Sequence, residues 1–148
     1  RERQVTAIGQ LTHGRGAGSR STSGLESAAR NHGLERQMDH DERYERAREF
    51  LEVTYKRWED AWEGNAVQRD RQAGIYTDPA KVHPIRHKGR WFSVPDAHLS
   101  EPSPQRTPVL FQAGTSDRGR QFAAQNAEVV SLGGTTPLAI RNHIERIR

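Results

Sequence analysis

The stretch TPVLFQAGTSDRGRQFAAQNAEVVSL, residues 107–132, decides the fold class of this chain. Its two short apolar runs are separated by a polar segment with helical character, which predicts a buried strand, a helix and a second strand at residues 107–114, 116–127 and 128–132. A second helix is predicted over residues 136–148. Strands and helices alternating at this spacing predict parallel strands joined by right-handed crossovers. The C-terminal part is therefore predicted to be α/β, with two βα units.

Upstream, residues 38–62 predict a long amphipathic helix. Aromatic and aliphatic side chains recur there with a 3.6-residue period and share one face: Tyr44, Ala47, Leu51, Tyr55, Trp58 and Trp62. Two shorter helices are predicted before it, at residues 3–12 and 25–31, and Gly33 is a natural stop for the second.

Between these parts, residues 64–105 form a long excursion without helical periodicity, which five prolines interrupt. Within it, residues 83–95 predict a β-hairpin with Lys88 and Gly89 at its turn. His83 and His87 are four residues apart, but Pro84 disfavours a helix between them and no carboxylate completes a ligand set. We therefore expect no metal site.

The composition describes a polar, basic chain of 148 residues. Hydrophobic residues make up 32% of it, the mean hydropathy is −0.96, and 23 Lys and Arg oppose 19 Asp and Glu. Positive and negative residues are interleaved, which favours a solvated surface over a nucleic-acid patch. The length suits about one domain and is short of the ~250 residues of a closed (β/α)8 barrel.

Cysteine is absent, and no apolar run reaches the ~18 residues of a membrane span. These features predict a cytoplasmic protein without membrane contact. The chain starts and ends within predicted helices, so we expect it to be a piece of a longer protein.

The turn after the strand at 107–114 is the first candidate binding site. Gly114, Thr115 and Ser116 lie between the carboxyl end of that strand and the first turn of a helix, where free N–H groups and the helix dipole favour a phosphate. The alternative is that Ser116 only caps the helix, which is the commoner use of serine. Asp117 would oppose a phosphate unless it points to solvent.

The second candidate is the pair His40 and Tyr44, at the start of the long helix. Residues four apart share one helix face, so both rings are placed to reach a ligand over the helix start. The alternative is that Tyr44 belongs to the apolar face and His40 to the cap region.

Four segments in this order resemble the luciferase-like flavin-dependent monooxygenases: LESAARNHGL, MDHDERYERAREFLEV, TDPAKVHPIRHKGRWFSV and PSPQRTPVLFQAGTSDRGRQFAAQNAEVV. The resemblance is to the branch of nitrilotriacetate monooxygenase component A and the long-chain alkane and dibenzothiophene-sulfone monooxygenases. It covers nearly the whole chain, whereas the chain corresponds only to the middle of the family.

The resemblance implies that residues 1–148 are a single incomplete segment of a TIM (β/α)8 barrel, with about three βα units. It implies a two-component oxidoreductase that uses O2 and reduced FMN, supplied by an NAD(P)H-dependent flavin reductase, to oxygenate a small organic substrate. His40 and Tyr44 match flavin-contacting residues of the family, and Ser116 matches the serine that holds the FMN phosphate. Residues 64–105 match an insertion over the active-site end, where Trp91 and Phe92 either line the substrate pocket or pack within the hairpin.

Residues 14–24 depart from the family pattern, in which a Gly-Arg pair precedes a barrel strand of the form G-W-N-[IV]-V-T-S. Gly14 and Arg15 match, as do Thr22 and Ser23, but residues 18–21, GSRS, replace the aromatic, amide and apolar residues of that strand. Glycine and arginine at such positions weaken strand propensity and packing. We therefore expect this strand to be compromised.

A second hypothesis is a non-enzymatic basic protein that binds phosphate-bearing polymers such as nucleic acid. It predicts binding that weakens steeply with salt. The interleaved charges and the four matching segments disfavour it. The resemblance covers only a segment of the enzymes, so it does not imply that this chain is active alone, and it leaves a homo-oligomer open.

Overall fold

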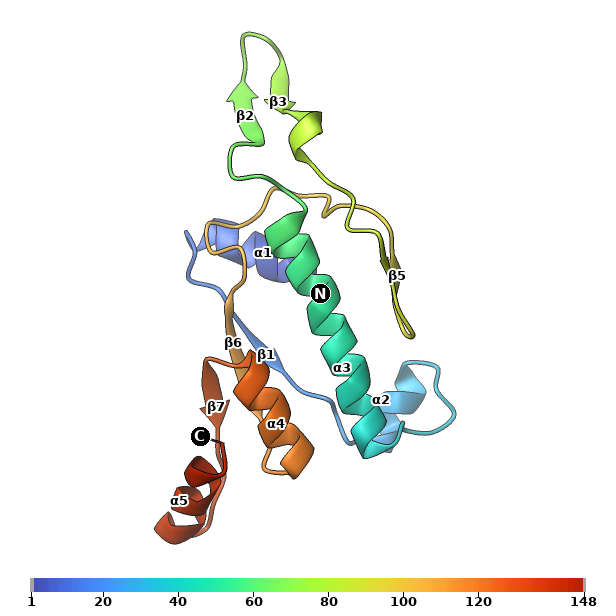
Figure 1. The fold of residues 1–148 in the computed structure, drawn as a ribbon, viewed down its shortest axis with the longest axis vertical. Helices are drawn as coiled ribbons and strands as arrows, with labels where there is room; N and C mark the ends of the chain where they lie inside the picture. Colours follow the sequence, from blue (N-terminus) through green and yellow to red (C-terminus); the bar gives the residue numbers. More distant parts are fainter. Residues whose placement is uncertain (1, 148) are drawn as a thin grey trace. The chain divides into compact units, whose positions relative to one another are not determined.

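The computed structural model describes residues 2–147, and Figure 1 shows its helices and strands. The chain divides into two compact units. The first unit contains the residues up to Gly16 together with Glu49–Pro108, and the second contains Ala17–Arg48 with the residues from Val109 onward. Arg1 and Arg148, at the ends of predicted helices, lie outside the described residues. None of the helices within residues 2–147 is long and apolar enough to cross a membrane.

The second unit is built on a three-stranded parallel sheet in the order β1-β6-β7. Its strands are β1 (Ala17–Arg20), β6 (Val109–Ala113) and β7 (Val129–Ser131), and each is followed in sequence by a helix: α2 (Glu26–Asn31), α4 (Asp117–Asn126) and α5 (Pro137–Glu145). Leu110 of β6 and Phe122 and Ala123 of α4 are buried in this unit. The predicted alternation of parallel strands and helices is confirmed.

The expectation that the strand at residues 14–24 is compromised is wrong, because Ala17–Arg20 form β1 in parallel register with β6. Gly18 pairs with Leu110, and a Cβ placed on Gly18 would meet the Leu110 side chain at 3.8 Å, an ordinary packing distance. Pairing with a neighbouring strand outweighs intrinsic propensity. The sequence indicated a poor strand but carried no signal for the partner that stabilises it.

The first unit contains helices and two β-hairpins. It includes α1 (Glu2–Leu11) and the second half of α3 (His40–Tyr55), with the hairpins β2 (Val67–Asp70)/β3 (Ile75–Thr77) and β4 (His87–Lys88)/β5 (Ser93–Val94). A small core forms where Ala61, Trp62 and Ala66 pack with Val82 and Ile85. The indole N–H of Trp62 also donates to the carbonyl of His98 at 2.8 Å.

Helix α3 confirms the predicted long helix, but its last turn is wider than α-helical. The α-helix ends at Tyr55, and Lys56–Asp60 form a π-helical turn. The Thr54 hydroxyl donates to the carbonyl of Phe50 at 3.0 Å, and such a bond to the carbonyl four residues back often bends a helix. The guanidinium of Arg106 donates to the carbonyl of Glu59 at 2.9 Å, so the wide turn is also held from outside.

The excursion contains more strand than its sequence predicted. The hairpin within residues 83–95 is confirmed by β4 and β5, although its loop runs from Gly89 to Phe92 instead of turning at Lys88 and Gly89. The β2–β3 hairpin was not predicted, because its short strands are mostly exposed and show little apolar alternation.

Candidate functional site

The candidate site begins at the junction between β6 and α4. Ser116 is the N-cap of α4, with φ −67° and ψ 157°, and its Oγ accepts a hydrogen bond from the N–H of Gly119 at 3.1 Å. Ser116 therefore caps α4. A cap uses one of the unpaired N–H groups at a helix start, and those of Asp117 and Arg118 have no acceptor within the helix. They supply two donors beside the Ser116 hydroxyl.

Tyr44 of α3 lies against this junction. A Cβ placed on Gly119 would come within 2.8 Å of the Tyr44 hydroxyl oxygen and within 3.0 Å of Ser116 Oγ. A Cβ placed on Gly114, on the other side of the turn, would be 3.3 Å from the same Tyr44 oxygen. Glycine at both positions makes room for the phenol, and the hydroxyls of Tyr44 and Ser116 consequently face the same small space.

His40 completes the group one helical turn before Tyr44. The two rings lie 5.1 Å apart between centroids, and Tyr44 makes an edge contact with Phe122 at 5.6 Å. Tyr44 is buried, with 7% of its surface exposed, whereas the His40 side chain is 47% exposed and its Nδ1 lies 2.8 Å from an Asp41 carboxylate oxygen. The structure thus brings together the three residues that the sequence singled out, with His40 at the solvent side.

Arginine side chains order the start of α4. Arg120 is buried and donates to the carbonyl of Thr115 and to the carboxylate of Asp117, so it ties the turn to the first residues of the helix. Arg118 pairs with Glu45 of α3. The Asp117 side chain is 89% exposed. Its charge is therefore in solvent, where it does not oppose a phosphate at the turn.

Gln112 is a buried polar residue that the sequence analysis did not single out. It lies in β6 with 2% of its surface exposed, and its amide nitrogen donates to the carbonyl of Ala113 at 3.0 Å. Its side-chain oxygen has no hydrogen-bond partner among the described residues. A glutamine within the apolar run of a buried strand was the available signal. It adds an acceptor just before the β6–α4 junction.

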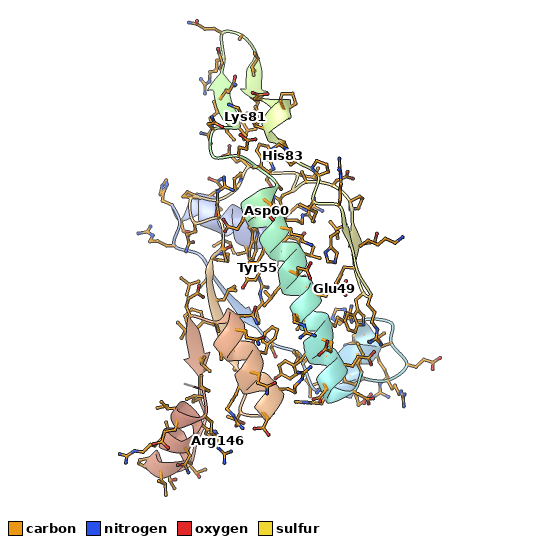
Figure 2. All side chains as sticks on the ribbon, viewed as in Figure 1. Glu49, Tyr55, Asp60, Lys81, His83 and Arg146 are labelled. Carbon is orange, nitrogen blue, oxygen red and sulfur yellow. The ribbon has the colours of Figure 1, made fainter. Side chains whose placement is uncertain are left out.

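The remaining candidates lie in the first unit and have partners of their own. His83 Nε2 is 2.8 Å from a Glu63 carboxylate oxygen on the surface, whereas His87 is buried and its Nε2 lies 3.3 Å from Glu49 (Figure 2). Phe92 packs against Phe50 of α3, with 5.8 Å between ring centroids, a contact outside the hairpin that neither alternative named. The Arg90 guanidinium lies over the Trp91 indole, 4.5 Å from its ring centroid, in a cation–π contact.

The β6–α4 junction therefore presents hydroxyl and N–H donors at the positive end of a helix dipole, next to two aromatic rings. Such donors suit a phosphate or another anion. The rings of His40 and Tyr44 suit an aromatic group attached to it. The arrangement fits a ligand that combines both parts.

Comparison with known proteins gives a family for this arrangement. The family described as luciferase-like monooxygenase matches residues 3–148. The chain is 53% identical, over 146 residues, to a long-chain alkane monooxygenase of Geobacillus thermodenitrificans (strain NG80-2), and this match covers 99% of the chain and 33% of the relative. It is 38% identical, over 128 residues, to nitrilotriacetate monooxygenase component A of Aminobacter aminovorans, with coverage of 86% and 28%. The chain thus spans about a third of the length of these relatives.

Solved structures agree with the sequence matches. The crystal structure of long-chain alkane monooxygenase superposes with a TM-score of 0.93 at 52% identity, covering 99% of this chain and 34% of that one. A riboflavin lyase, solved with modified FMN and riboflavin, superposes with a TM-score of 0.91 at 41% identity, covering 99% and 32%.

Proposed function

Because the chain belongs to the luciferase-like monooxygenase family, we propose that it forms part of the FMN site of a flavin-dependent monooxygenase. The observation that carries the proposal is the meeting of His40, Tyr44 and Ser116 at the β6–α4 junction. The identity to named monooxygenases supports the reaction class, and the riboflavin lyase solved with modified FMN supports the flavin.

The residues at the junction fit the phosphate of FMN. A phosphate dianion needs several donors and a positive field, and the start of α4 offers the Ser116 hydroxyl, free N–H groups and the helix dipole. Arg120 is already bound to Thr115 and Asp117, so its role is to hold the turn in shape. We assign phosphate binding to Ser116 and the backbone of α4.

His40 and Tyr44 fit the aromatic part of FMN. When bound, reduced FMN supplies the electrons for the reduction of O2. The residues of this chain bind and orient the cofactor. The Tyr44 ring is fixed by burial and by the edge contact with Phe122, and the half-exposed His40 ring lies at the solvent side, where it can cover a ligand.

The wider setting follows from the same family. We propose that β1, β6 and β7 are strands of a (β/α)8 barrel, because they are parallel, adjacent and each followed by a helix. The name of the relative from Aminobacter, a component A, supports a separate NAD(P)H-dependent flavin reductase as partner. The other reactants are O2 and a small organic substrate. We place the reaction in the cytoplasm.

Substitutions at Ser116 separate phosphate binding from helix capping. Aspartate is as good an N-cap as serine, so Ser116→Asp is expected to leave stability nearly unchanged while its charge weakens FMN binding about tenfold or more. Ser116→Ala is expected to lower the free energy of unfolding by about 1 kcal/mol. Calorimetric titration with FMN and urea unfolding measure the two effects.

Riboflavin is the matched control ligand, since it lacks the phosphate. Its affinity is expected to be the same for the unmodified chain and for Ser116→Asp. Equal FMN affinity in these two proteins would refute the phosphate assignment, and a parallel loss of FMN and riboflavin binding would place the effect elsewhere in the site.

A further inference from the structure

Glu49 is a buried carboxylate in the middle of α3, on the side nearest the β4–β5 hairpin (Figure 2). Its side chain is only 10% exposed. Glutamate is almost never buried unless it is paired, so a partner of matching polarity is required. The partner is the backbone of the hairpin loop.

Three consecutive N–H groups of the loop donate to this carboxylate. The N–H of Phe92 lies 2.8 Å from Oε1, that of Arg90 lies 3.0 Å from Oε2, and that of Trp91 lies 3.1 Å from both oxygens. Successive N–H groups that converge in this way form an anion-binding nest. The Glu49 carboxylate occupies the nest as a ligand supplied by the chain itself.

The absence of a side chain on Gly89 lets the Glu49 carboxylate approach the loop N–H groups closely. A Cβ placed on Gly89 would lie 2.2 Å from Glu49 Oε1, so any other residue would displace the carboxylate or the loop. The N–H of Gly89 donates to the carbonyl of Phe92 at 2.9 Å and closes the loop. The loop is therefore shaped around the carboxylate.

The other ionisable groups near Glu49 come from the hairpin and from its own helix. His87 of β4 places Nε2 3.3 Å from Glu49 Oε1, while its Nδ1 lies 3.3 Å from Lys56 Nζ and 3.7 Å from Glu52 Oε1. Lys56 also pairs with Glu52 at 2.6 Å. Glu52 is the exposed member of this group and touches none of the loop N–H groups among the contacts described, which makes it a matched control for Glu49.

We propose that Glu49 is the positioning residue of the hairpin loop: its ionised carboxylate holds residues 89–92, and with them the Arg90–Trp91 pair, and loss of the charge releases the loop. This inference goes beyond the proposed function, since it holds whether or not the chain binds a flavin. It gives the loop that carries Trp91 a defined shape that depends on one side chain of α3.

The pH dependence follows from the balance of forces on Glu49. Burial raises the pKa of its carboxyl group, but the hydrogen bonds from Phe92, Trp91, His87 and Arg90 outweigh burial and hold the pKa below 4.5. A carboxyl group whose pKa is lowered by folding stabilises the folded state above its unfolded pKa and loses this effect as the pH falls through the folded value. The loop is therefore expected to stay held at neutral pH and to be released only when the pH falls through this lowered pKa.

Amide hydrogen exchange tests the proposal directly. In Glu49→Gln, which keeps the size and removes the charge, the N–H groups of Arg90, Trp91 and Phe92 are expected to exchange about tenfold faster or more, because hydrogen bonds to a charged group are the strong ones. Glu52→Gln is expected to leave these rates unchanged. Equal rates in Glu49→Gln and the unmodified chain would overturn the proposal.

Two further measurements distinguish positioning from general packing. Formate added to Glu49→Ala is expected to slow the exchange of the same three N–H groups again, because a small carboxylate can enter the nest. In the unmodified chain, the amide proton shift of Phe92 is expected to titrate with a midpoint below pH 4.5. The absence of formate rescue would show that the charge does not hold the loop.

Discussion

Replacing Leu110 with alanine is expected to lower the free energy of unfolding by about 2–5 kcal/mol. Leu110 lies in the central strand of the sheet with 2% of its surface exposed. Its backbone N–H and carbonyl are bonded to Glu128, at 2.7 and 3.1 Å, and alanine retains both bonds. The loss therefore comes from the buried side chain and the cavity it leaves.

Val109, the preceding residue in β6, is the matched control. It is 38% exposed, so Val109→Ala removes less buried apolar surface and is expected to cost less than about 1 kcal/mol. Urea unfolding followed by circular dichroism measures both variants. A similar cost for the two substitutions would contradict the burial of one face of β6.

The second large effect is expected from Gly119→Ala. Alanine in place of glycine within a helix ordinarily stabilises by roughly 0.5–1 kcal/mol. Here the added Cβ would lie 2.8 Å from the Tyr44 hydroxyl oxygen and 3.0 Å from Ser116 Oγ, so we expect a net loss of about 1–3 kcal/mol from overpacking. Thermal or urea unfolding gives the sign of the change in the free energy of unfolding, which shows whether overpacking or the gain in helix propensity is larger.

Two variants accompany this prediction. Gly133→Ala is the control, since no atom lies within 4 Å of the added Cβ, and it is expected to be close to neutral. Adding Tyr44→Phe to Gly119→Ala removes one of the two clashing oxygens, so the double variant is expected to lose less than the sum of the single changes. Strict additivity would mean that the Tyr44 hydroxyl does not reach the junction.

The fold could be predicted from the sequence where local pattern and tertiary contacts agree. Leu110 in the apolar run of β6 is one such case, and the apolar stripe that runs from Leu51 of α3 to Trp58 of the π-helical turn is another, since these side chains are buried as expected. The strand β1 was misjudged because its stability comes from pairing with β6 and not from its own residues. The π-helical turn after Tyr55 accepts a hydrogen bond from Arg106, 47 residues along the chain from Glu59, and the local periodicity gives no signal for this contact.

For the candidate site, the sequence identified the residues but did not predict that they lie close together in space. Strand-to-helix position marked Ser116, and helical spacing marked His40 and Tyr44, yet only the structure brings Tyr44 to the turn that Ser116 caps. Gly119 could have signalled this approach, since a glycine in the first turn of a helix has a cost that close packing explains. Glu49 was missed because a charged residue in a helix rich in charges is normally read as exposed.

Titration of FMN into the chain, compared with the His40→Ala variant, tests the central claim most directly. His40 is half exposed, so its loss should leave stability unchanged, and unfolding curves verify this. We predict saturable binding of one FMN per chain, weakened about two- to tenfold in His40→Ala by the loss of an aromatic contact. A folded chain that binds no FMN, or that binds it with the same affinity in both forms, would contradict the assignment of His40, Tyr44 and Ser116 to a flavin site.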